Sequence, residues 1–147
     1  MDSEEASTHK SADQKSEDVD ALLKLALSLD KADHYEEMLE AAQRAIDLDP
    51  TSALAWAGKA RALQKLERIS EATIANDQAL LLDTNLPLAW INRSGLQIIQ
   101  ERFPEGFRSA TRAIELAPND PRAWANKGMA LVGPGPRVVG KIGRAHV

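Results

Sequence analysis

Apolar residues recur at helical spacing, every three or four positions, through most of the chain. One apolar face marks a first predicted helix and another marks a second helix after a short polar break. These positions are Leu22, Leu25, Ala26 and Leu29 in the first helix and Tyr35, Leu39, Ala42, Ala45 and Ile46 in the second. No segment alternates apolar and polar residues between hairpin turns as a strand does. The pattern predicts an all-α fold of paired antiparallel helices.

The pattern repeats with a period of 34 residues. Trp56, Trp90 and Trp124 lie 34 positions apart, and each follows an alanine. The segments 45–50, 79–84 and 113–118 share the same spacing. These landmarks define repeats at 19–52, 53–86 and 87–120 and a partial repeat at 121–132. Prolines at 87 and 121 suit the first turn of a helix, and those at 50 and 118 suit positions just past a helix end.

These residues resemble the tetratricopeptide repeat, in which each repeat has a first helix carrying a large apolar residue and a second helix that contacts it through small residues. The matching positions are Trp56, Ala60, Leu63, Ala72 and Ala79 in the second repeat and Trp90, Ser94, Gly106, Ala113 and Pro118 in the third. The resemblance implies a right-handed α-solenoid over residues 19–132, with the tryptophans packed into its core. Residues 103–106 depart from the family pattern and predict an altered turn between helices.

The two ends of the chain lack this periodicity. Residues 1–18 are polar and acidic, and we expect them to be disordered. Residues 133–147 begin with a Gly-Pro run and predict an irregular tail. The final segment, 142–147, is similar to the translation of a sequencing adapter, and we interpret it as the end of a truncated gene product.

Composition narrows the possible chemistry. The 147 residues include no cysteine and carry a net charge of −4, which excludes thiolate sites and disfavours nucleic acid as a partner. The net charge is −5 over 19–52, zero over each of the next two repeats and +5 over 121–147. No apolar run could span a membrane, and we expect a cytoplasmic protein. Neither a metal-ligand pair nor a phosphate loop is present, so we expect no cofactor, no metal site and no enzyme activity.

The family resemblance instead implies protein binding in a concave groove lined by the first helices. Its register gives the candidate groove residues Leu23, Leu27, Leu54, Arg61, Lys65, Ile91, Asn92, Ile98, Arg122, Asn126 and Met129. These positions mix apolar contact area with hydrogen-bond donors and cations, which suits a protein segment or peptide bearing acidic groups. Arg61 and Lys65 are four residues apart and share one helix face.

Three other interpretations remain open at this stage. The repeats can present substrates to a glycosyltransferase, phosphatase or prolyl isomerase domain absent from this chain. They can form a co-chaperone that grips chaperone tails, although among the family's clamp positions only Asn92 matches and Arg122 substitutes by charge. The partial fourth repeat also leaves an apolar helix without a partner, which favours self-association.

Overall fold

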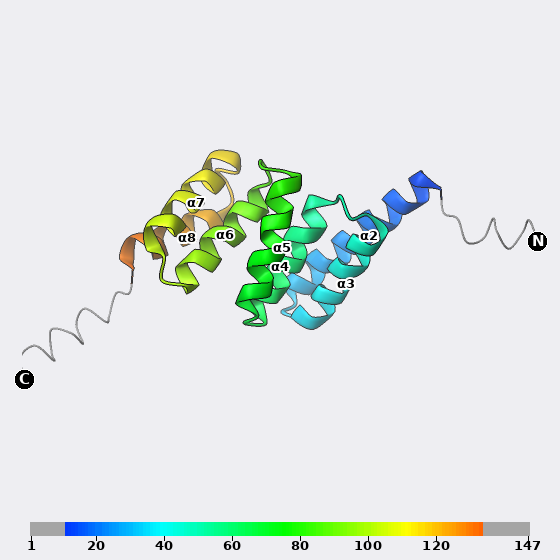
Figure 1. The fold of residues 1–147 in the computed structure, drawn as a ribbon, viewed down its shortest axis with the longest axis horizontal. Coiled ribbons are helices and arrows are strands. Elements are labelled where there is room, and N and C mark those ends of the chain that lie inside the picture. The colour runs from blue at the N-terminus through cyan, green and yellow to red at the C-terminus, as the bar shows by residue number, and fades with distance from the viewer. Residues whose placement is uncertain (1–10, 134–147) are drawn as a thin grey trace, which may run out of the picture. The chain divides into compact units, whose positions relative to one another are not determined.

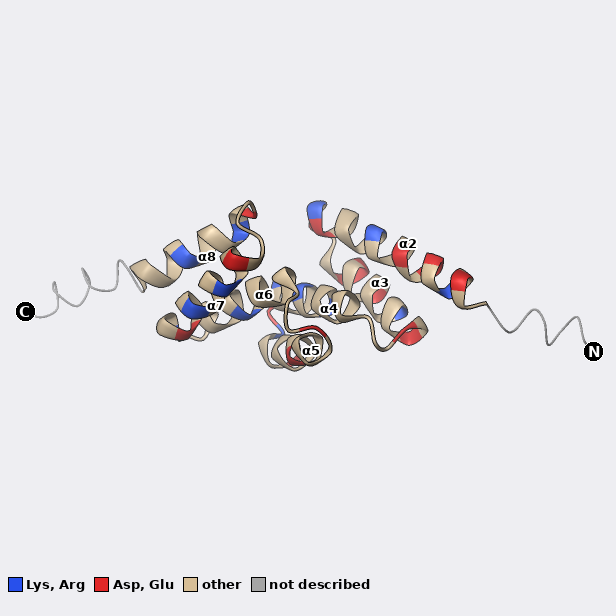
Figure 2. Ribbon diagram, turned by 90° about the horizontal axis from the view of Figure 1, so that it is seen from above, with Lys and Arg blue, Asp and Glu red and all other residues tan. Residues whose placement is uncertain are grey.

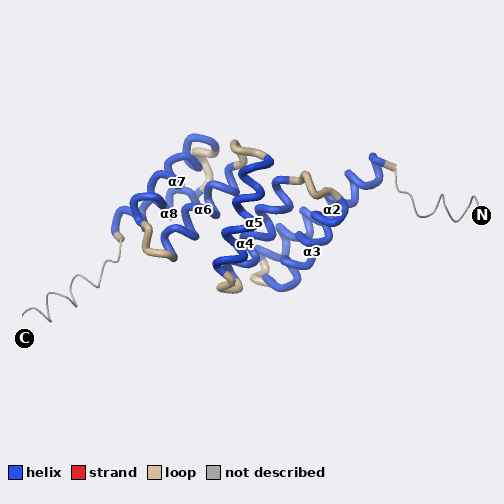
Figure 3. The backbone as a smooth tube through the Cα atoms, viewed as in Figure 1, coloured by secondary structure: helices blue, strands red, loops and turns tan. Residues whose placement is uncertain are grey.

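The computed structural model describes residues 11–133 and contains seven α-helices and no strand in that range. The helices are α2 (Ala12–Lys31), α3 (Tyr35–Leu48), α4 (Ala53–Lys65), α5 (Ile69–Leu82), α6 (Pro87–Ile99), α7 (Phe103–Leu116) and α8 (Pro121–Val132) (Figure 1). Short loops join them (Figure 3). No described helix is long and apolar enough to cross a bilayer. The all-α prediction of consecutive helix pairs is confirmed, and the final tail, 134–147, lies outside the described residues.

The chain divides into two compact units after Thr84. In the first unit α2 packs on α3, α3 packs on α4, and α4 packs on α5. In the second unit α6 packs on α7, and α8 contacts both of them. The first helices of the repeats are α2, α4, α6 and α8, and the second helices are α3, α5 and α7. The buried residues are predominantly alanines, which allow the helices to approach closely.

A single turn geometry joins the two helices of every complete repeat. Asp33, Glu67 and Glu101 lie 34 positions apart and all adopt the left-handed conformation, with φ of 59°, 62° and 59°. The following amide donates across each turn, as Arg68 does to the Leu63 carbonyl at 2.8 Å. Non-glycine residues seldom adopt this conformation, so its recurrence shows that the turn is part of the repeat.

Helix α2 begins earlier than the sequence pattern predicted. Residues 12–18 are helical, so the prediction of disorder is wrong for them, while residues 1–10 lie outside the described range. Ser11 caps the helix by accepting a hydrogen bond from the Gln14 amide at 3.1 Å, and Gln14 donates to Asp18 one turn later at 3.1 Å. The extension was missed because nearly all of its side chains face solvent and therefore create no apolar stripe.

The predicted irregular turn at 103–106 is also wrong. These residues form the first turn of α7, which has Pro104 where no intrahelical amide is needed. Gly106 lies against α6, and a Cβ atom there would come within 2.9 Å of Ile98 Cγ1 and 3.4 Å of the Ser94 carbonyl. The glycine at this position, which matches the family pattern, allows close packing of α7 on α6.

Candidate partner-binding surfaces

The tryptophans form the repeated local motif of the first helices. Trp56 Nε1 donates to the Pro50 carbonyl at 2.9 Å, and Trp124 Nε1 donates to the Pro118 carbonyl at 2.8 Å. A cation three residues later lies over each ring, at distances between 5.3 and 5.6 Å from the ring centroid. These cations are Lys59, Arg93 and Lys127. The tryptophans were expected in the core, but Trp56 and Trp90 are half-buried and Trp124 is exposed.

In the first unit, leucines from two first helices supply accessible apolar surface. Leu27 on α2 is 54% exposed and Leu54 on α4 is 43% exposed. Leu23 is half-buried and packs against the core formed by α2, α3 and the start of α4. A partner that covered these two side chains would remove apolar area from water, which is favourable for binding.

Leu23 also borders a hollow of about 380 Å³ below the first half of α2. The hollow lies between α2 and the loop that joins α3 to α4, and its apolar wall includes Val19 and Leu48. Its polar lining residues are Lys15, Ser16, Asp20, Asp49 and Ser52. Acidic residues are frequent along α2 (Figure 2). The lining of the hollow therefore combines apolar and charged side chains beside the extended end of α2.

Arg61, which the sequence offered as a cation for an acidic ligand, is already paired. Its Nε donates to Asp30 Oδ2 at 2.6 Å and links α4 to α2, with the two side chains only 18% and 10% exposed. The other Asp30 oxygen, Oδ1, is buried and accepts no hydrogen bond from the described residues. Lys65, one turn beyond Arg61, is exposed. An acidic ligand would therefore meet Lys65 freely but would compete with Asp30 for Arg61.

Tyr35 completes this polar cluster at the turn between α2 and α3. Its hydroxyl donates to Asp33 Oδ1 at 2.7 Å. The hydrogen bond to Asp33, partial burial and the negative charges of Asp33 and Asp30 raise the pKa of Tyr35, while Arg61 opposes them. Charged groups at the end of α2 and in the middle of α4 therefore act on the tyrosine at the start of α3.

In the second unit the predicted lining of α6 is largely interior. Ile91 is buried in the cluster between α6, α7 and α8 together with Ala113 and Ala123. Asn92 is buried as well, and Ile98 is half-buried where α6 meets Gly106 of α7. Ile91 and Asn92 are 3% and 1% exposed and therefore do not line an accessible surface.

Two of the three predicted residues on α8 make contacts within the chain. Asn126 Nδ2 donates to the Ile91 carbonyl at 3.1 Å and to Ser94 Oγ at 2.7 Å, which links α8 to α6. Arg122 binds both carboxylate oxygens of Asp120, the residue that caps α8, at 3.1 and 2.7 Å. Met129 is about half exposed and offers apolar contact area.

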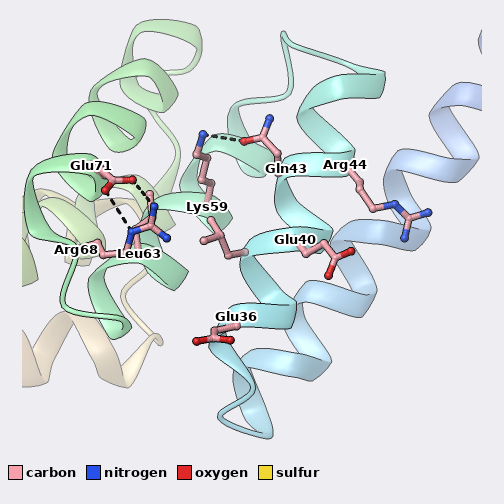
Figure 4. Close-up of a pocket in the computed structure, with 9 residues that line it drawn as sticks. Glu36, Glu40, Gln43, Arg44, Lys59, Leu63, Arg68 and Glu71 are labelled. Carbon is pink, nitrogen blue, oxygen red and sulfur yellow. Dashed lines mark hydrogen bonds and ion pairs between the residues drawn. The ribbon is translucent and has the colours of Figure 1, made fainter.

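A second hollow of about 400 Å³ lies between α3, α4 and α5, with Leu39 and Leu63 among its lining residues. Two pairs of its polar side chains contact one another (Figure 4). Lys59 donates to Gln43 Oε1 at 2.7 Å, and Arg68 donates to both oxygens of Glu71 at 3.2 and 2.6 Å. We assign these contacts to helix packing rather than to ligand recognition.

Two features that were not predicted, the start of α2 and the cations over the tryptophan rings, have signals in the sequence. Ser11 and Gln14 have the spacing of a capping box and mark the start of α2. Of the residues that line the hollow beside this end of α2, the groove prediction included only Leu23. The Lys or Arg three residues after each tryptophan was visible as a repeated pair. Within residues 11–133, no group of three or more His, Asp or Glu side chains could hold a metal ion.

Comparison with known proteins agrees with this geometry. Residues 19–52 match the model of the tetratricopeptide repeat family. The fold resembles the Arabidopsis OM64 TPR domain, with a TM-score of 0.68 and 18% identity over 79% of this chain and 96% of that one. It also resembles the second TPR domain of human RPAP3, solved with the HSP70 peptide SGPTIEEVD, with a TM-score of 0.65 and 22% identity over 79% and 97%.

A third similar structure is a Thermobaculum terrenum O-GlcNAc transferase mutant, with a TM-score of 0.74 and 19% identity over 84% of this chain and 23% of that one. At these identities the three likenesses establish the fold alone. No curated protein matches the chain in sequence.

Proposed function

Because this chain is built from tetratricopeptide repeats, we propose that it is a protein-interaction scaffold that binds a peptide or partner segment on the surface between α2 and α4. The observation that carries the proposal is the exposure of two leucines, Leu27 on α2 and Leu54 on α4. Leu23, on the same helix as Leu27, borders the hollow of the first unit. Met129 on α8 adds a separate apolar contact in the second unit.

The contacts of the cations define the ligand we propose. Arg61 is bound by Asp30 and Arg122 by Asp120, so the charge of both is already balanced within the chain. Lys65 remains exposed on α4. We therefore propose that a ligand of the first unit is anchored by apolar side chains on the leucines, and that an acidic group facing Lys65 contributes less.

The location of the protein stays a proposal, and we place it in the cytoplasm because the cysteine-free chain needs no oxidising compartment. The chaperone-tail alternative is supported by the HSP70 peptide present with the human RPAP3 domain. Against it, Asn92 is buried and Asn126 donates to α6. We therefore rank it below the apolar ligand.

Selection from a phage-displayed peptide library, followed by fluorescence polarisation, tests this function. We expect selected peptides to carry two apolar anchors, and we expect Leu27→Glu and Leu54→Glu each to weaken binding at least tenfold. Ile74→Glu, at an exposed position on α5, is the matched control and should leave binding unchanged. Equal binding by all three variants would contradict the assigned surface.

The peptide SGPTIEEVD serves as the second probe. Binding of this peptide that is lost in Asn92→Ala but survives Leu27→Glu would favour the chaperone-tail function over the proposed one. Binding that is weak and insensitive to Asn92→Ala would support the apolar ligand.

A further inference from the structure

One face of α8 is apolar and uncovered within residues 11–133. Five residues at helical spacing share this face and are exposed: Trp124, Ala125, Gly128, Leu131 and Val132. None of them is charged. The adjacent cation, Lys127, lies over the rings of Phe107 and Trp124 at 5.2 and 5.6 Å. The face is thus apolar throughout and its bordering charge is held by aromatic rings of the same chain.

Earlier repeats show what this face normally contacts. Leu63 and Ala60 occupy the same repeat positions on α4 as Leu131 and Gly128 on α8, and both are buried where α5 packs on α4. On α6 the position equivalent to Leu131 is Gln97, which accepts a hydrogen bond from Ser109 of α7 at 2.7 Å. Gly128 and Leu131 on this α8 face are therefore equivalent to positions that are buried between two helices in the two preceding repeats.

The pattern of residue sizes on the face is complementary to itself. Gly128 lies at the centre, with the large Trp124 one turn before it and Leu131 and Val132 one turn after it. A Cβ atom at Gly128 would meet nothing within 4 Å, so a second helix can approach there closely. If two copies cross in antiparallel orientation at Gly128, each Trp124 packs on Leu131 and Val132 of the other copy. Such mutual contact is the requirement for a twofold interface.

We propose that a second copy of this chain covers the α8 face and that the protein forms a twofold dimer through α8. The absence of charge on the face favours an identical apolar helix over a charged partner. The exposed side chains and their flanks would bury on the order of 1,000 Å² over both copies, which is the lower end for specific interfaces. The dimer is therefore weak, and its population rises with protein concentration.

Sedimentation equilibrium of the 147-residue chain, from micromolar to near-millimolar concentration, tests the proposal. The mass should rise from 16.0 kDa toward twice that value. Leu131→Glu should weaken association at least tenfold. Leu81→Glu, at a similarly exposed leucine on α5, is the control and should leave association unchanged. A constant monomer mass, or equal effects of the two variants, would overturn the proposal, and a monomer would leave the face to a different partner.

Gly128→Gln keeps the test valid if Leu131→Glu disturbs folding. Glutamine favours the helix more than glycine does and has free space in the monomer, so folding should persist while the close crossing is blocked. Gly128→Cys adds a single thiol to a chain without cysteine and tests the symmetry. Oxidation should give a covalent dimer because helices in contact bring facing Cα atoms within disulfide range. A dimer that never crosslinks at this position would overturn the twofold arrangement.

Discussion

The second repeat, residues 53–86, and the partial repeat, residues 121–132, have the same first helix but different surroundings. In both, the tryptophan donates to a carbonyl six residues earlier and lies beneath a cation three residues later. In the second repeat, α5 covers the next turns of α4, so Leu63 is only 1% exposed. On α8 the equivalent Leu131 is 69% exposed.

This difference separates two sources of structure in a repeat. The tryptophan motif is local, because its ring, its acceptor and its cation lie within ten consecutive residues, and it is present on both α4 and α8. Burial of the later turns depends on a second helix. The start of a first helix is therefore structured by its own residues, whereas burial of its later turns depends on the helix that packs against them.

The largest predicted effect compares the two leucines directly. Leu63→Ala should lower the free energy of unfolding by about 2–5 kcal/mol, because it leaves a cavity in a closed helix contact. Leu131→Ala should change it by less than about 0.5 kcal/mol, because most of its side chain already faces water. Urea denaturation followed by circular dichroism, at a low protein concentration that keeps the chain monomeric, measures both. Equal losses would show that α8 is covered in solution.

Two glycines provide the next comparison. Gly106→Ala should destabilise the protein by about 1–3 kcal/mol, because the new Cβ would overlap Ile98 on the facing helix. Gly128→Ala should instead stabilise it by up to about 1 kcal/mol, because the new methyl group has free space and alanine favours the helix. Thermal melts followed by circular dichroism report the sign of each change. A lower melting temperature for Gly106→Ala and a higher one for Gly128→Ala would support the comparison. A lower melting temperature for both variants would show that the α8 face at Gly128 is not open.

The two links between first helices differ in chemistry. Asp30 and Arg61 join α2 to α4 through charge, whereas the neutral Asn126 joins α8 to α6 by hydrogen bonds. Asp30→Asn should cost about 1–2 kcal/mol, because it leaves the partly buried Arg61 without its carboxylate. Asp20→Asn, an exposed change on the same helix, is the control. A urea titration in which both variants match the parent would show that the ion pair adds nothing.

The repeat architecture was predictable because its determinants are local. The spacing of Trp56, Trp90 and Trp124 and the prolines at helix ends gave the number and order of the helices, since each motif acts within its own repeat. The start of α2 was not predicted, because apolar periodicity detects only helices that bury a face. The spacing of Ser11 and Gln14 was a signal for it. The exposed extension buries nothing, so its cap was the only available signal.

The candidate surface was less predictable because it depends on contacts between helices. A family register places Ile91 and Asn92 on the lining, but their burial follows from how α6 packs with its neighbours. Arg61 illustrates the same limit. Its partner, Asp30, lies 31 residues earlier, and no spacing rule connects the two. The family register was sufficient for Leu27 and Leu54, because no neighbouring helix covers these two side chains.

The smallest predicted effect concerns the turn that begins the second helix of each repeat. Tyr35 occupies the position filled by Ile69 and Phe103 in the next two repeats, so only the first repeat places an ionisable group there. Because Tyr35 is the single tyrosine, its ionisation can be followed by ultraviolet absorbance. Its pKa should exceed the ordinary value of about 10, since the phenol donates to Asp33 and the phenolate would be repelled by it.

The raised pKa has a defined consequence for stability. The folded state favours the neutral phenol, so the contribution of Tyr35 is complete below the ordinary pKa and disappears as the pH rises through the raised one. Asp33→Asn should return the titration toward the ordinary value, and asparagine tolerates the left-handed backbone at this position. Glu40→Gln removes a charge that does not act on Tyr35 and should leave the titration unchanged. If Asp33→Asn left the pKa of Tyr35 unchanged, the hydrogen bond between Tyr35 and Asp33 would not persist in solution. The turn of the first repeat would then resemble the equivalent turns of the next two repeats, which have no ionisable group at this position.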